Sequence, residues 1–148
     1  MRHWIFISSR FLTALESQEV LNQLQMFLKT WTSHDSPVEA EARIEYNCVL
    51  ILELQAHSAQ SGCSTDTLFR YIKTLEVMFN CEWLNREIVL IESGGILKLL
   101  PANKLSQSIN PIAFSGCRVL DSLSYHPQTA ELPWISGPES WLAKYYQN

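Results

Sequence analysis

The sequence predicts an α+β fold in which two main helices pack on one face of an antiparallel sheet. Three observations predict it. The candidate elements follow the order β-α-β-β-α-β-β, and the first six match the split βαβ (ferredoxin-like) arrangement. Both candidate helices carry apolar residues with helical period. Two apolar runs flank a glycine pair, which is typical of an antiparallel hairpin. We expect the remaining C-terminal residues to wrap this core as an extension.

The length and composition indicate one domain, residues 1–148. The chain has 148 residues, 47% of them hydrophobic, which is enough for a real core at the commonest domain size. It contains no internal repeat, no low-complexity tract and no stretch that reads as a linker.

The first strand and helix lie in residues 3–31. Residues 3–8, HWIFIS, are β-branched and aromatic and predict a buried strand. Thr13 and Glu16 have the spacing of a capping box, and a helix is predicted over about 17–31. Residues 34–37 interrupt the helical pattern.

The next region predicts two strands and the second helix. Residues 38–55 favour two strands with a turn at Asn47, although one long bent strand also fits. A polar loop over 56–64 precedes a helix over about 65–79. Its apolar stripe is formed by Leu68, Ile72, Leu75 and Phe79.

The last third predicts shorter elements. Residues 86–101 read as a hairpin around Ser93-Gly94-Gly95, residues 103–109 as a short helix, and residues 117–125 as a strand. A short C-terminal helix is predicted from a capping-box spacing with a proline in its first turn. The residues that predict it are Ser136, Glu139, Pro138, Trp141, Leu142 and Tyr145.

Charge and hydropathy argue against several functional classes of protein. The formal net charge is −4 and the sequence pI is about 5.5, and the eleven Lys and Arg residues are scattered, so no nucleic-acid contact is expected. The first residues contain only a four-residue apolar run, too short for a signal peptide, and no run is long enough to cross a membrane. We therefore expect a soluble cytoplasmic protein that does not bind membranes.

The cysteines and the missing motifs argue against a metal or cofactor. Cys48, Cys63, Cys81 and Cys117 are widely spaced, and we expect most of them to be buried thiols in a reducing compartment. The chain has no phosphate-binding loop, no H-E-x-x-H, no paired metal cysteines and no G-x-S-x-G. No metal and no cofactor are predicted.

Four features along the chain resemble a family of short uncharacterised bacterial proteins. They are an early W-I pair, a first helix ending in F-L-x-x-W-x-x-H, an S-G-C-S-x-D loop and a C-terminal P-W…S-W stretch. Here they are Trp4-Ile5, Phe27-Leu28 with Trp31 and His34, residues 61–66, and Pro133-Trp134 with Ser140-Trp141. Some members carry the label of an ABC-transporter ATPase, which the missing phosphate loop leads us to reject here. The resemblance implies kinship and supplies no activity.

Cys63 is the candidate catalytic residue. A helix start lowers a thiol pKa and its free amides attract anions, so Gly62, Ser64, Thr65 and Asp66 are the candidate ligand-binding residues around it. The structural alternative is simpler: Ser64 or Thr65 is the N-cap, Asp66 favours the helix dipole, Gly62 makes the turn, and Cys63 packs inward.

The split βαβ topology brings several groups to the Cys63 end of the domain. His34 and His57 are the candidate bases beside the thiol, and a cysteine with histidines also offers zinc ligands. Arg86 lies at the far end of a helix about 22 Å long and is not expected there. The other groups expected there are Arg2, His3, Trp31, Glu92 and Ser93.

Three tryptophans lie near the ends of predicted elements: Trp83, Trp134 and Trp141. This placement is typical either of an interaction patch or of the rim of a core.

Together these observations favour a non-catalytic binding or protein-interaction module. Its partner is an unidentified protein or a small anionic ligand, and a homodimer through a sheet edge or the tryptophans is compatible with the composition. The alternative is a small thiol-dependent enzyme or redox sensor that uses Cys63.

Overall fold

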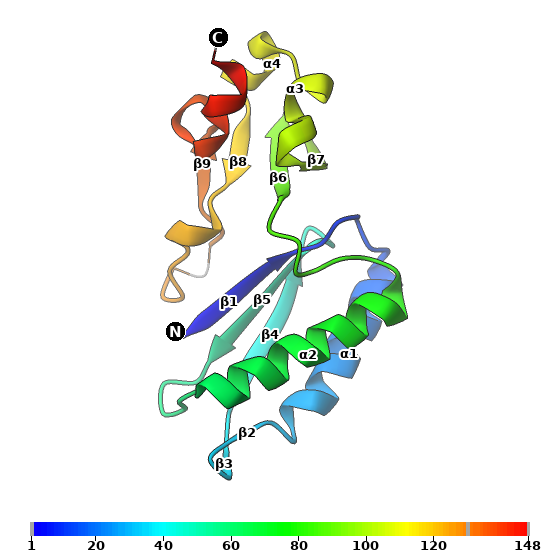
Figure 1. Ribbon diagram of the computed structural model, residues 1–148, viewed down its shortest axis with the longest axis vertical. Coiled ribbons are helices and arrows are strands. Elements are labelled where there is room, and N and C mark those ends of the chain that lie inside the picture. Colours follow the sequence, from blue (N-terminus) through cyan, green and yellow to red (C-terminus); the bar gives the residue numbers. More distant parts are fainter. Residues whose placement is uncertain (1, 130, 148) are drawn as a thin grey trace. The chain divides into compact units, whose positions relative to one another are not determined.

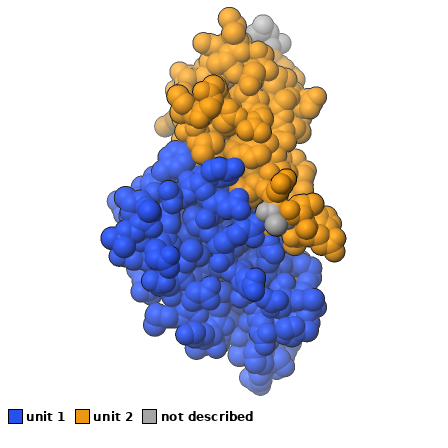
Figure 2. All heavy atoms as spheres, turned by 180° about the vertical axis from the view of Figure 1, so that it is seen from behind, with its two compact units in different colours: residues 1–85 blue, residues 86–148 orange. Residues whose placement is uncertain are grey.

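The computed structural model describes residues 2–129 and 131–147 of the chain. It confirms the predicted α+β class, with helices and antiparallel sheets (Figure 1). The chain forms two compact units, residues 1–85 and 86–148, which Figure 2 colours separately. Each unit has its own sheet and its own hydrophobic core and is described by itself; one domain over 1–148 stays a prediction.

The first unit contains a three-stranded antiparallel sheet and two long helices. Its strand order is β1-β5-β4, so β5 lies between β1, which precedes α1 in the chain, and β4, which follows it. The elements are β1 (His3–Ile7), α1 (Ala14–Leu28), β2 (Thr32–Ser33), β3 (Ser36–Pro37), β4 (Ala40–Glu45), β5 (Val49–Leu54) and α2 (Gly62–Phe79).

Both helices pack on one face of this sheet. Trp4 and Phe6 of β1 alternate with half-buried residues, and Leu50 and Leu52 of β5 pair with them on the same face. The core that they share with the helices includes Val20, Leu24 and Leu28 of α1 and Leu68, Ile72 and Leu75 of α2. The apolar stripes of both helices therefore face the core, as their helical period predicts.

Most predictions made for this unit from short sequence patterns are confirmed. Thr13 and Glu16 form the predicted capping box, and α1 begins at Ala14, three residues before the predicted start. Tyr46 and Asn47 both have positive φ, 55° and 56°, and their turn separates β4 from β5. Residues 38–55 thus hold two strands.

The sixth element of the predicted split βαβ core is absent from this sheet. In that arrangement the strand after α2 would pair with β1, but β6 (Ile88–Ser93) belongs to the second unit. Both edges of β6 are already hydrogen-bonded there, to β7 on one side and to β8 on the other. A strand with two partners cannot complete another sheet, so the core of the first unit is βαββα.

The second unit has a four-stranded antiparallel sheet in the order β7-β6-β8-β9. The predicted hairpin is confirmed: Ser93 pairs with Ile96, and Gly94 and Gly95 between them have φ values of 60° and 81°. A two-residue turn with both φ values positive favours glycine. The other elements are β7 (Ile96–Pro101), η1 (Ala102–Lys104), α3 (Leu105–Ser108), α4 (Pro111–Ser115), β8 (Arg118–Leu120), η2 (Ser122–Ser124), β9 (Trp134–Ser136), η3 (Gly137–Glu139) and η4 (Trp141–Tyr146).

The C-terminal segment differs from its prediction. Ser136 makes no side-chain cap; Ser140 caps instead, accepting from the amide of Leu142, and the segment forms 3₁₀ turns. The turn at Gly137 is tightly enclosed, since an added Cβ would lie 2.6 Å from Cys117 Sγ and 2.8 Å from the Phe114 carbonyl oxygen. That close packing holds the segment against α4. No helix among the described residues is long and apolar enough to span a membrane.

Candidate functional site

The helix that carries Cys63 begins earlier than predicted. The N-cap of α2 is Ser61, whose Oγ accepts from the Ser64 amide at 3.1 Å, while Ser64 Oγ accepts from the Ser61 amide at 2.7 Å. This reciprocal pair is a capping box with serine in the place of the usual glutamate. The expectation that Ser64 or Thr65 is the N-cap is therefore wrong.

Three of the four residues predicted to bind an anion make hydrogen bonds within the protein, and Ser64 makes them in the capping box. Ser64 is buried, and its carbonyl accepts from Trp31 Nε1 at 2.9 Å. The Thr65 amide donates to the Ser61 carbonyl at 3.0 Å. Asp66 is exposed and supplies a carbonyl to Arg70. Among the described residues, only the amides of Gly62 and Cys63 at this helix start have no acceptor.

Cys63 is exposed, which corrects the inward packing of the structural alternative. The other three cysteines are buried free thiols, as expected, and burial raises the pKa of each; for Cys48 it reaches about 12. Cys63 is thus the one thiol of the described chain that reagents in solution can reach directly.

The elements around this helix start meet largely as predicted. The Arg2 guanidinium, just before β1, donates to the carbonyls of Gln55 and Ser58 in the loop that precedes α2. Trp31, just beyond α1, reaches the first turn of α2 through its indole. Glu92, by contrast, belongs to the second unit and pairs there with Arg118 at 2.7 Å. Its expected place beside Cys63, and that of Ser93, depended on the absent fourth strand.

The two candidate bases have different surroundings. His57 Nε2 lies 2.9 Å from Glu39 Oε2, and both side chains are largely exposed. His34 has a φ of 51° in the turn between β2 and β3. Within residues 2–129 and 131–147, no three His, Cys, Asp or Glu side chains gather closely enough to hold a metal ion. The histidines are thus not assembled with Cys63 into a metal-ligand cluster.

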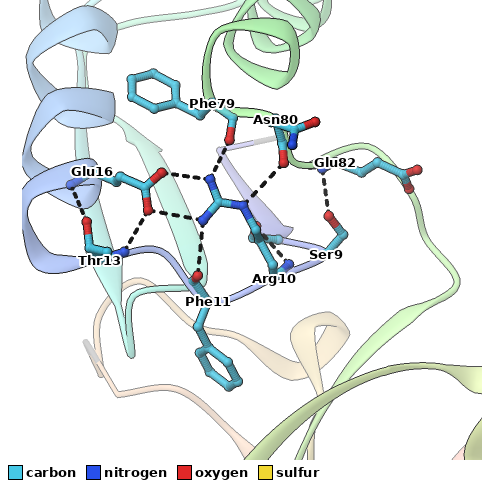
Figure 3. A network of polar contacts seen from close by, with 9 residues as sticks. Ser9, Arg10, Phe11, Thr13, Glu16, Phe79, Asn80 and Glu82 are labelled. Carbon is cyan, nitrogen blue, oxygen red and sulfur yellow. Dashed lines mark hydrogen bonds and ion pairs between the residues drawn. The ribbon is translucent and has the colours of Figure 1, made fainter.

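The opposite end of α2 carries a polar network that the sequence did not predict. Arg10 binds Glu16 through two parallel bonds of 3.0 and 2.7 Å and donates through Nε to the Asn80 carbonyl at 3.2 Å (Figure 3). It also donates to the carbonyls of Phe79 and Phe11. Arg10 holds the pKa of Glu16 at about 2, well below its usual range.

This network has a structural role. Arg10 satisfies carbonyls that the end of α2 leaves without intrahelical donors, and Asn80 closes the helix with a φ of 50°. In the groove beside it, the Glu76 carboxylate accepts from the amides of Trp83 and Leu84. The network ties the loop after β1 to the end of α2.

The second unit contains a small cavity beside the ends of β8 and β9, about 190 Å³ in volume. The side chain of Trp141 is 51% exposed at this cavity, an unusual exposure for so large an apolar ring. Lys144 Nζ lies 5.4 Å from the centre of its ring, and Tyr145 meets it edge-on. The lining residues are Val119, Leu120, Asp121, Ile135, Glu139, Ser140 and Trp141.

The three tryptophans of the predicted patch lie in different surroundings. Trp83 is 2% exposed and belongs to the core of the first unit, so it is not part of a surface. Trp134 is half-buried, with the Arg118 guanidinium 5.2 Å from its ring centre. Trp141 alone of the three is exposed beside a cavity. Its exposure could not be predicted, because tryptophan near an element end is found both in cores and at surfaces.

Comparison with protein-family models, with curated proteins and with solved structures finds no match. The resemblance to the short bacterial proteins stays a prediction.

Proposed function

We propose that the protein is a non-catalytic binding module that takes a partner protein at the cavity beside Trp141. The exposed indole of Trp141 is the observation that carries this proposal. Tryptophan is enriched at the energetic centres of protein interfaces, because it buries a large area with few rotatable bonds. The half-buried Ile135 lines the same cavity and adds apolar surface.

A pull-down with the full-length chain tests this proposal. Proteins bound by the wild-type chain are compared with those bound by Trp141→Ala and Trp134→Ala. We expect at least one specific partner to be lost with Trp141→Ala. The matched control is Ile112→Ala, which removes an 84%-exposed apolar side chain that does not line the cavity. The same set of partners for Trp141→Ala and the wild type would exclude this surface.

A thiol-dependent activity at Cys63 is the second candidate. The observation that favours it is the exposure of Cys63 on the first turn of α2, with two unpaired amides beside it. Alkylation kinetics test this candidate: a thiolate at neutral pH would react faster than a free cysteine in solution. Labelling of Cys63 at or below the rate of free cysteine would leave the thiol without a catalytic role.

We infer in addition that the protein acts in the cytoplasm and binds neither nucleic acid nor membranes. The net charge of −4 and the four free cysteines support this inference, because phosphate binding needs clustered basic residues and free thiols persist in reducing compartments. Self-association is an alternative use of the Trp141 surface. Light scattering of wild type and Trp141→Ala distinguishes it, since a homodimer through that surface would become a monomer in the variant.

A further inference from the structure

The cavity beside Trp141 has two chemically different parts. Its apolar lining residues are Ile135, Trp141 and the buried Val119 and Leu120, and its acidic ones are Asp121 and Glu139. No Lys or Arg is among the residues that line it. The site therefore combines apolar surface with negative charge.

Both carboxylates retain capacity to accept hydrogen bonds. Asp121 uses Oδ2 to accept from Ser124 Oγ at 2.6 Å, and no described residue donates to its Oδ1. Glu139 is exposed, and within the described part of the chain its carboxylate has no donor. A carboxylate accepts up to about four hydrogen bonds, so both groups can bind a further cation.

The remaining polar group of the lining disfavours an anion. The Ser140 hydroxyl donates to the Gly137 carbonyl at 2.6 Å and accepts from the Leu142 amide. Its proton is already used, so it cannot donate to a ligand. Lys144 lies over the rings of Trp141 and Tyr145 and does not line the cavity.

The volume of the cavity limits the occupant to one side chain. Small-molecule sites commonly enclose about 300–1,000 Å³. A cavity of about 190 Å³ is smaller than that range. Lysine and arginine have long aliphatic stems that cover apolar surface while the charged head stays at a polar edge.

Building on the proposed function, we propose that this cavity binds an arginine or lysine side chain of the partner protein. The aliphatic stem lies against Ile135 and the indole of Trp141, and the cationic head meets Asp121 and Glu139. Charge complementarity selects this occupant over an acidic or a purely apolar side chain.

An NMR titration of the full-length, ¹⁵N-labelled chain tests the inference. The probes are acetylated, amidated Gly-X-Gly tripeptides in which X is arginine, lysine, citrulline, norleucine or glutamate, added to millimolar concentration. We expect the arginine and lysine peptides to shift the indole N–H signal of Trp141. Citrulline keeps the shape of arginine without its charge, and its peptide should bind more weakly, by roughly threefold to fivefold for a solvent-exposed ion pair.

Variants assign the binding to the cavity. Glu139→Gln and Asp121→Asn should each lower the affinity for the arginine peptide by up to about fivefold and leave the affinity for the citrulline peptide unchanged. Trp141→Ala should lower the affinity for every peptide by roughly tenfold or more. Glu131→Gln, which removes an exposed charge outside the lining, is the matched control and should change nothing.

The outcomes separate this inference from the proposed function. Equal binding of arginine, citrulline and norleucine peptides, stronger binding of the glutamate peptide, or no peptide-induced shift at Trp141 would overturn the basic-side-chain inference. The proposed function stands or falls independently with the pull-down, in which partner loss by Trp141→Ala is measured without reference to charge.

Discussion

The indole Nε1 of Trp31 donates to the carbonyl oxygen of Ser64 at 2.9 Å, across 33 residues of sequence. Trp31 lies just beyond α1, and Ser64 lies in the first turn of α2, where it forms the capping box with the N-cap residue Ser61. The bond is buried, so neither group has water as an alternative partner. The bond therefore holds the first turn of α2, which carries the exposed Cys63, close to the end of α1.

We expect Trp31→Phe to lower the free energy of unfolding by about 0.5–1.5 kcal/mol, since it removes the buried indole donor and leaves the Ser64 carbonyl only the helical amide of Leu68. Urea denaturation of the full-length chain measures the change. Trp4→Phe is the matched control: the ring centre of Trp4 lies 5.8 Å from that of Trp31 in the same core, with the rings tilted by 57°, and no described residue accepts from its indole. Equal losses in the two variants would mean that ring volume, and not the hydrogen bond, decides the effect.

Acid should weaken the first unit through Glu16. Its pKa is lowered from 4.5 to about 2 in the folded chain, mainly by the hydrogen bonds from Arg10. A lowered folded-state pKa stabilises the fold above the unfolded pKa, and this contribution is lost as the pH falls from about 4.5 to about 2. We expect the difference in urea midpoint between wild type and Glu16→Gln to be largest at neutral pH and to vanish near pH 2.

Glu19→Gln supplies the control for this titration. Glu19 is exposed on the same helix and has no ion pair with any described residue. Its variant should follow the wild type at every pH. A Glu16→Gln difference that persists unchanged into acid would contradict the assignment of the acid-sensitive contribution to Glu16.

Native alkylation should modify one cysteine. Cys63 is exposed and the other three thiols are buried, so a bulky maleimide should add a single label in the folded chain and four after denaturation. Mass spectrometry of the intact protein counts the labels, and Cys63→Ser should reduce the native count to zero. A second native label would show that one of the buried thiols becomes accessible by local opening.

Gly137→Ala should destabilise the second unit by about 1–3 kcal/mol, the usual range for overpacking. The added methyl group meets Cys117 Sγ and the Phe114 backbone at distances below 3.0 Å. Gly116→Ala is the control, because its Cβ would have 4.0 Å to the nearest atom. Thermal unfolding followed by circular dichroism compares the two variants, and equal melting temperatures would refute the steric argument.

Local chemistry in the sequence predicted much of the fold. Thr13 and Glu16 marked a helix start because both halves of a capping box lie within four residues. Gly94 and Gly95 marked a hairpin for a similar reason, since the turn that joins paired strands needs positive φ values. In each case the decisive contact is short-range.

One unusual local pattern and the contacts between distant segments could not be predicted in the same way. The start of α2 was placed too late because a serine at the third helical position, Ser64, is a less familiar partner for Ser61 than glutamate. Arg10 was missed because its acceptors at Phe79 and Asn80 lie about seventy residues away. The partnership of β6 depended on which edges were already paired, and no local pattern records that.

The contact between Gly137 and Cys117 also bears on how this chain can change over evolutionary time. The sulfur atom and the Phe114 carbonyl oxygen both occupy the space that a side chain at position 137 would need. A smaller residue at 117 would remove only the first of these contacts, because the carbonyl belongs to the backbone. Among diverging descendants we therefore expect glycine to be retained at 137 whichever residue stands at 117.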